Sequence, residues 1–185
     1  VGNSIKLGGA SGIITATTFS GNLTGDVTGN ASGLTGTPNI NVGVSTGTSF
    51  NGELHATSLL KEEVNITAGK LSDNTDIYLE NGMVHLFTTT ETTTSTPNIE
   101  YDLTTSIDDV MSIGESVTVV IITTAAAAGY SANLQIATSP FTVEWLGGSA
   151  PSTGGSGGYD VYTYNIIKTG NNGSFVILAN LVNFA

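Results

Sequence analysis

The sequence predicts an all-β protein in two parts. Residues 1–61 are expected to form an intertwined trimeric fibre shaft of short Gly/Thr-rich repeats, and residues 62–185 a jelly-roll-like β-sandwich knob. The 185 residues include 29 Thr, 24 Gly, 18 Ser and 16 Asn but only four Lys and no Arg, a composition that favours strands and turns over helices. The first third of the chain is repetitive, and the remainder contains short strand-like runs separated by turn residues.

The shaft prediction depends on repeats at two scales. Residues 12–23 align without gaps onto residues 43–54, with six of twelve positions identical. From Gly21 to Gly36 a four-residue unit recurs, which consists of Gly, a small polar residue, an aliphatic residue and then Thr or Ser. Glycine at every fourth position lets the chain bend, but one aliphatic residue in four is too little to build a core within a single chain.

Two interpretations of this segment remain. In the first, three identical chains wrap around a shared axis, and the apolar side chains point toward that axis. The predicted axial residues are Phe19, Leu23, Val27, Ala31, Leu34 and Phe50. In the second, the segment is a Gly/Thr-rich linker without fixed structure. The aliphatic residues stay in phase along the repeat, which linkers seldom show, so the wound shaft is preferred.

From about residue 62 the repeats stop and runs with strand character follow. These runs are 76–79, 83–87, 99–103, 116–123, 132–136, 141–145, 159–167 and 174–181. Turn residues at Asn81-Gly82 and at 170–173 predict two hairpins. Trp145 and Tyr162 are expected to fill the core of the sandwich. The last run is apolar on both faces over 176–179, so one of its faces is expected to pack on a neighbouring subunit.

Charge and composition exclude several classes of function. Fifteen acidic residues against four Lys give a net charge of -11, which repels nucleic-acid phosphates and anionic membrane surfaces. No Cys is available for a disulfide or a thiolate metal site, and no apolar run approaches the about 20 residues of a membrane helix. His55 and His85 lie in different segments, and the alternation of His85 with Val84 and Leu86 predicts a solvent-facing position for it. No catalytic residue, metal site or cofactor is therefore assigned.

Recognition residues are expected on loops of the knob, because the sheets hold the ends of a loop while its sequence stays free. The candidate contact loops are 88–96, 125–131 and 149–159. The last contains a glycine cluster that lacks the Lys of a phosphate loop and is interpreted as a flexible surface loop. The candidate contact residues are Thr92, Tyr130 and Tyr159. For the tyrosines and Trp145, packing and stacking against sugar rings both remain open.

Two stretches resemble proteins of tailed bacteriophages. The repeat that begins Gly21-Asn22-Leu23-Thr24-Gly25 is similar to repeats in tail fibres and other virion appendages, particularly of phages that infect marine cyanobacteria. The motif from Val143 to Pro151, followed by Asp160 to Tyr164, is similar to a terminal module of such proteins. The resemblance implies a homotrimer located in the virion, whose N-terminal side joins other virion proteins and whose C-terminal knob points outward.

These features are compatible with three functions. The preferred one is a homotrimeric tail fibre whose knob contacts a host-surface glycan or protein, without binding nucleic acid or inserting into a membrane. A start at Val1 rather than Met fits a portion of a longer fibre. The alternative is a capsid-attached fibre or decoration protein with a purely structural knob that keeps the three chains in register. An enzyme that cuts glycans is disfavoured, because such enzymes usually need a longer parallel β-helix and paired carboxylates in a groove.

Overall fold

The computed structural model describes residues 58–59 and 61–184. The chain divides into two compact units, Val1–Leu54 and His55–Ala185, and the described residues belong to the second. His55 and the predicted axial residues of the shaft lie outside the described residues; the latter are Phe19, Leu23, Val27, Ala31, Leu34 and Phe50. The described fold is therefore that of the predicted knob.

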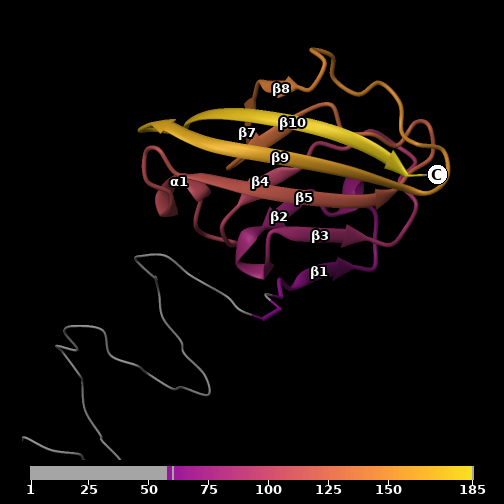
Figure 1. Cartoon of the computed structure of the whole chain (residues 1–185), viewed down its shortest axis with the longest axis horizontal. Coiled ribbons are helices and arrows are strands. Elements are labelled where there is room, and N and C mark those ends of the chain that lie inside the picture. The colour runs from indigo at the N-terminus through magenta and orange to yellow at the C-terminus, as the bar shows by residue number, and fades with distance from the viewer. Residues whose placement is uncertain (1–57, 60, 185) are drawn as a thin grey trace, which may run out of the picture. The chain divides into compact units, whose positions relative to one another are not determined.

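Two sheets form the knob (Figure 1). Sheet A has six strands in the order β1-β3-β5-β9-β10-β8, namely Val64–Thr67, Val84–Phe87, Ser116–Thr124, Tyr159–Gly170, Ser174–Phe184 and Val143–Trp145. Sheet B has four strands in the order β2-β4-β6-β7, namely Asp76–Tyr78, Asn98–Glu100, Leu134–Ile136 and Ser139–Phe141. The connections include two 3₁₀ turns, η1 (Leu71–Asp73) and η2 (Leu79–Asn81), and the short helix α1 (Ile107–Val110).

The chain alternates between the two sheets over its first six strands. β1, β3 and β5 are neighbours in sheet A and run parallel, as β2, β4 and β6 do in sheet B. Parallel neighbours need a crossover between them, and here each crossover contains a strand of the other sheet. The long hairpin β9–β10 then extends sheet A beside β5, and β8 pairs in parallel with the far side of β10.

The all-β prediction is confirmed, but the pairing of the strands differs from that of a jelly roll. Jelly-roll sheets are antiparallel, whereas both sheets here are mixed and the first six strands pair only in parallel with one another. The physical reason is that run length and alternation predict strands and faces, whereas pairing direction depends on which distant strand becomes the neighbour.

One of the two predicted hairpins is confirmed and the other is wrong. Residues 171–173 form the turn between β9 and β10, which pair along their whole length. At Asn81-Gly82 the chain instead passes from β2 in sheet B to β3 in sheet A. Gly82, with φ of 108°, ends the η2 turn, and a Cβ there would lie 2.7 Å from the carbonyl oxygen of Glu63. An Asn-Gly step thus gives a reversal of direction without fixing the partner strand.

The apolar core lies between the sheets. The contribution of sheet B consists of aliphatic side chains, namely Ile77, Ile99, Leu134 and Ile136. From β9, Tyr162 and Tyr164 are 1% and 0% exposed and stack with ring centroids 6.4 Å apart. Trp145, on the edge strand β8, is half-buried and meets Tyr164 edge to face at 5.9 Å. Tyr162 therefore lies inside the core, and Trp145 lies at its border.

Sheet A is also apolar on its outer face, which reverses one prediction. On β3 the side chains of His85 and Phe87 are buried, whereas Val84 and Leu86 lie on the outer face. The predicted solvent-facing position of His85 is wrong: the ring is buried and has hydrogen-bond partners in Asn65 and Gly82, which the alternation of apolar residues does not reveal. Burial lowers the pKa of His85, although the 3.0 Å hydrogen bond with the carbonyl oxygen of Gly82 opposes this shift. A buried, neutral imidazole results.

Candidate recognition surface

The three candidate contact loops lie at the same end of sheet A. Residues 88–96 follow β3, residues 125–131 follow β5, and residues 149–159 lead into β9. β3 and β5 run parallel and β9 runs against them, with Thr124 paired with Tyr159, so these ends meet. Figure 1 shows this end at the arrowheads of β3, β5 and β10, next to the label of the C-terminus. We call the three loops together the loop cluster.

Backbone hydrogen bonds join the three loops to one another. The amide of Ala126 donates to the carbonyl of Glu91 at 2.8 Å, and the amide of Ser95 donates to the carbonyl of Tyr130 at 3.0 Å. The amide of Gly154 donates to the carbonyl of Ala127 at 2.9 Å. Residues 125–131 therefore form the centre of the loop cluster, with one other loop on each side.

A buried carboxylate fixes the first loop. Glu91 is 1% exposed and accepts five hydrogen bonds within the described residues. Two come from the amide and hydroxyl of Ser72 at 2.7 and 2.9 Å, and three come from Thr92 and Thr93. Burial alone would raise the pKa of Glu91, but the bonds from Ser72, Thr93 and Thr92 outweigh it and hold the pKa below its ordinary value. The carboxylate thus stays charged and ties the loop to η1.

A second buried carboxylate fixes the third loop. Asp160 is 1% exposed; it accepts a hydrogen bond from the amide of Gly155 at 2.9 Å and one from the side-chain amide of Asn183 at 2.6 Å. Beside it, a Cβ on Gly154 would lie 2.4 Å from the carbonyl oxygen of Gly129. The start of the glycine cluster, interpreted from sequence as a flexible loop, is instead packed against the second loop, and glycine is required there for close backbone approach.

The surface of the loop cluster is rich in hydroxyl groups and poor in charge. Its three segments contain no Lys and no Asp, and their one Glu is the buried Glu91. A shallow hollow of about 350 Å³ lies between the loops, lined by Thr90, Thr124, Ala125, Ala126, Ala127, Ser156 and Gly157. Such a surface suits a neutral ligand with many hydroxyl groups better than an ionic one.

The predicted contact residues all belong to segments that meet here, in different settings. Thr92 is exposed, and its hydroxyl accepts a 2.8 Å hydrogen bond from the ammonium group of Lys70. Tyr130 is half-buried on the central loop. Tyr159 is 49% exposed at the start of β9, in register with Phe184, and so belongs as much to the outer face of sheet A as to the loops.

Sequence reasoning missed the residues that hold the loop cluster in shape. Ser72 and Asp160 lie outside the predicted loops, and each becomes important only through a partner distant in sequence. One signal was present: Glu91 is a single acid within a run of Thr and Ser, an unusual place for a charge unless it has a local purpose.

In the residues that the structure describes, no cluster of three or more His, Asp or Glu side chains is suited to hold a metal ion. Over the same residues, no helix has the length and apolar character to cross a membrane.

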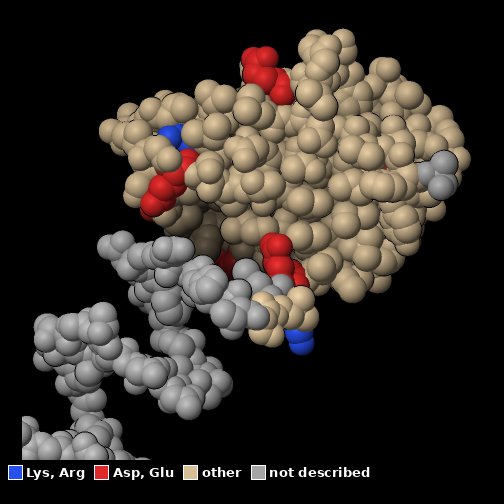
Figure 2. Space-filling view, in the orientation of Figure 1, with Lys and Arg blue, Asp and Glu red and all other residues tan. Residues whose placement is uncertain are grey.

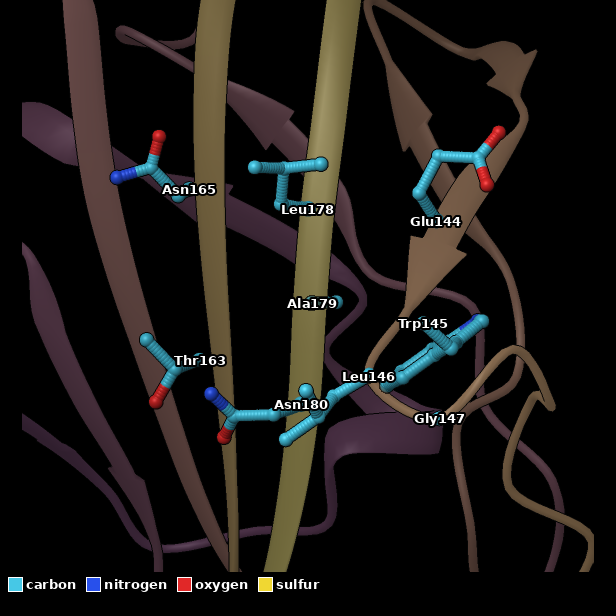
Figure 3. Close-up of a pocket in the computed structure, with 9 residues that line it drawn as sticks. All are labelled: Glu144, Trp145, Leu146, Gly147, Thr163, Asn165, Leu178, Ala179 and Asn180. Carbon is cyan, nitrogen blue, oxygen red and sulfur yellow. The ribbon is translucent and has the colours of Figure 1, made fainter.

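A second hollow, of about 440 Å³, lies on the outer face of sheet A beside β8 (Figure 3). Thr163 and Asn165 of β9 and Leu178 and Asn180 of β10 project side by side from the sheet, and Glu144 lies at the rim. The hollow is open and separate from the loop cluster.

Comparisons with known proteins give no match to this chain, whether with protein-family models, with curated proteins or with solved structures.

Proposed function

We propose that this chain is a structural and adhesive virion protein, a homotrimeric phage tail fibre in which residues 1–61 form the shaft and the loop cluster of the knob contacts the host surface. The observation that carries the proposal is the convergence of the three loops at one end of sheet A. No catalytic step, cofactor or metal is part of this role.

The direction of the strands supports this role. The described chain enters the knob at Val64, the first residue of β1, and β1 runs parallel to β3 and β5 toward the loop cluster. The chain that leads in from residues 1–57 therefore reaches the end of β1 that is remote from the loops. The loop cluster and the point at which the chain enters β1 therefore lie at opposite ends of the sheet, which suits a surface that meets a host.

The chemistry of the loops supports a neutral ligand. Hydroxyl groups from Thr and Ser side chains and the aromatic ring of Tyr130 suit hydrogen bonding and stacking with a sugar. The net charge of -11 for the chain disfavours acidic polysaccharides. We therefore propose a neutral host-surface glycan as the first ligand class to test.

A second candidate function is a capsid-attached fibre or decoration protein whose knob only keeps three chains in register. The observation that favours it is that several loop hydroxyls already bond within the protein. The hydroxyls of Ser95 and Ser131 pair at 2.6 Å, and the hydroxyl of Thr93 donates to Glu91 at 3.2 Å. Loops whose polar groups are used internally offer fewer of them to a ligand.

The test is binding of the full chain to a panel of marine cyanobacterial strains, measured with labelled protein by cell sedimentation. Tyr130→Ala removes an aromatic ring from the loop cluster, and Ala127→Trp places a bulky ring in its hollow. We expect each to weaken binding by about tenfold or more. Binding of the unchanged chain no stronger than that of an unrelated trimer would remove the adhesive role and leave the structural alternative.

Matched controls come from the connection between β4 and β5, which leads to the first residue of β5 and so lies at the other end of sheet A. Tyr101 is 39% exposed and Val110 is 47% exposed in that connection. Tyr101→Ala makes the same change as Tyr130→Ala, and Val110→Trp introduces the same bulky ring as Ala127→Trp, both away from the loop cluster. We expect both control variants to leave binding unchanged. Equal losses in both pairs would show that the loop cluster is not the contact surface.

A further inference from the structure

We infer, building on the proposed trimer, that the outer face of sheet A is the surface on which three copies of this chain pack, with that face turned toward the threefold axis. The inference names the surface on which the copies meet and its orientation to the axis, which a trimeric fibre as such does not fix.

The first observation is a row of aliphatic side chains across five adjacent strands. Strand register places Ile66 of β1 beside Leu86 of β3, Leu86 beside Ile122 of β5, Ile122 beside Val161 of β9, and Val161 beside Val182 of β10. Cross-strand neighbours on one face are in contact. An unbroken aliphatic row of this length on a face that meets water is unfavourable, so the row indicates a covered surface.

Further apolar side chains extend this row along the strands. Val64, Val84 and Val120 form a second row in register beside the first. Several members of the face are well exposed in the single chain: Ile66 is 64% exposed, Phe184 56%, Leu178 47%, Val182 46% and Val176 41%. The apolar surface therefore covers most of sheet A rather than a single spot.

The inverted pattern of β3 is a second observation. His85 points into the core while Val84 and Leu86 point outward. A strand that met water on its outer face would place its most polar side chain there. The arrangement fits a sheet with an apolar partner on each side, sheet B on one and another protein surface on the other.

The distribution of charge favours this face as the place where two copies of this chain can meet. Among the strand residues of the outer face, the one ionisable acid is Glu144 on the edge strand β8, and none is basic. Figure 2 shows this face as a broad uncharged surface, with charged side chains gathered around its margin. Copies that each carry a net charge of -11 repel one another, and they approach most easily where neither surface carries charge.

The position of the preceding chain also points to sister copies. The 57 residues before the described part lead to β1, which is the edge strand of this face and carries Val64 and Ile66. Chains that wind together over those residues would bring their β1 strands close to one another. At about 4.8 Å between strands and about 3.4 Å per residue, the face covers on the order of 600–800 Å², which the two neighbouring copies of a trimer would share.

Polar groups within the face would fix how the copies fit together. In the hollow of Figure 3, Thr163, Asn165 and Asn180 interrupt the aliphatic surface. Within the described residues, the side chain of Asn165 makes one hydrogen bond, which its amide donates to the hydroxyl of Thr118 at 3.2 Å. Its carbonyl oxygen and its other N–H group remain available to a partner. Burying such groups without partners is costly, so they restrict the alignments in which the copies can pack.

Thiol labelling tests the inference, because the chain has no Cys and one introduced Cys gives one signal. Val182→Cys reports on the outer face, and Val110→Cys is its matched control; in the single chain the two valines are 46% and 47% exposed. In the native full chain we expect the thiol at 182 to react about tenfold or more slowly than the thiol at 110. In urea the two rates should be equal.

Solution mass is measured on the same samples, with three copies of 18.8 kDa, about 56 kDa, expected. Equal labelling of both thiols in a particle of three copies would overturn the inference and leave the proposed fibre intact. Slow labelling in a single-copy particle would mean that residues 1–57 of the same chain cover the face, which overturns both the inference and the homotrimer. Slow labelling in a particle of two copies would overturn the threefold arrangement.

A second pair of variants tests the energetics. Val182→Glu places a charge on the face, and Val110→Glu places the same charge at a site of equal exposure in α1. We expect the particle of the Val182→Glu variant to dissociate at a protein concentration about tenfold higher than that of the Val110→Glu variant, or its knob to become accessible to protease where that of Val110→Glu does not. Equal behaviour of the two variants would contradict the inference, and neither result bears on host binding by the loop cluster.

Discussion

The ammonium group of Lys168 lies 2.8 Å from a carboxylate oxygen of Asp108, although β9 and α1 are far apart in the sequence. Lys168 is 6% exposed and also donates to the carbonyl oxygens of Asp108 and Met111, the latter at 2.9 Å. The other carboxylate oxygen of Asp108 accepts a 3.0 Å bond from the amide of Gly173. This pair fastens α1 to the turn of the β9–β10 hairpin, at the end of the sheet remote from the loop cluster.

Lys168→Met should destabilise the knob strongly. The change keeps the length of the side chain but removes the ammonium group that pairs with the partly buried Asp108 carboxylate and donates to two carbonyl oxygens. Removing one partner of a buried pair costs about 3 kcal/mol of the free energy of unfolding. Urea unfolding at fixed protein concentration measures the loss. Lys61→Met, at an exposed lysine, serves as control, and a comparable loss there would contradict the assignment.

His85 should make the knob less stable in mildly acidic solution. Its pKa in the folded protein lies below the ordinary value of 6.5, because burial disfavours the charged imidazole. The unfolded chain therefore binds the proton more readily, and stability falls as the pH decreases from about 7 through 6.5, by at most about 1.4 kcal/mol per pH unit. Melting temperatures between pH 7.5 and pH 5.5 measure this, and His85→Gln should flatten the dependence. An unchanged slope in the variant would assign the effect to other groups.

Glu91→Gln should loosen the first contact loop. The variant replaces a carboxylate that accepts bonds from Ser72, Thr92 and Thr93 with an amide that accepts fewer, at an expected cost of about 1–3 kcal/mol. The pKa of Glu91 is lower in the folded protein than its ordinary value of 4.5. The stabilisation by the carboxylate is therefore fully present above pH 4.5 and is lost as the pH falls through the folded pKa. Hydrogen exchange at the amides of Thr92 and Thr93 reports it directly. Glu80→Gln, at an exposed acid, should leave those amides protected.

Gly154→Ala should separate the second and third contact loops. The added Cβ would lie 2.4 and 2.5 Å from the carbonyl oxygens of Gly129 and Ala126, both backbone atoms that cannot move alone. We expect roughly 1–3 kcal/mol of lost stability from such overpacking, together with weaker binding to host cells if the loop cluster is the contact surface. Ser152→Ala, at an exposed position of the same loop, is the control. A fully stable Gly154→Ala variant would mean that the two loops do not pack as described.

The local features of the knob could be predicted from the sequence. The period of two at Tyr162 and Tyr164 predicts their shared inward face, because it depends on backbone geometry alone. The turn at 171–173 could also be predicted, because its Asn and Gly residues are a local turn signal. The apolar character of both faces at 176–179 is also visible in the sequence, and the structure shows Val176 and Leu178 on the outer face with Ile177 and Ala179 inside.

Features that depend on distant partners could not be predicted. Nothing near Asp108 in the sequence indicates Lys168, and nothing near Glu91 indicates Ser72. The parallel neighbours β1, β3 and β5 follow from crossovers through sheet B, which local patterns do not encode. The inward position of His85 was missed because its hydrogen-bond partner Asn65 lies on another strand, 20 residues away in the sequence.

The place of β10 in sheet A makes one side of the sheet depend on the last described strand. β10 is the last strand of the described chain, yet it lies between β9 and β8, and the small edge strand β8 pairs with it alone in sheet A. A polypeptide released by the ribosome before Ser174 would lack the element that holds this side of the sheet together. Without β10, β9 would become the edge of sheet A and β8 would lose its pairing partner in that sheet, so the integrity of this side of the sheet depends on residues from Ser174 onward.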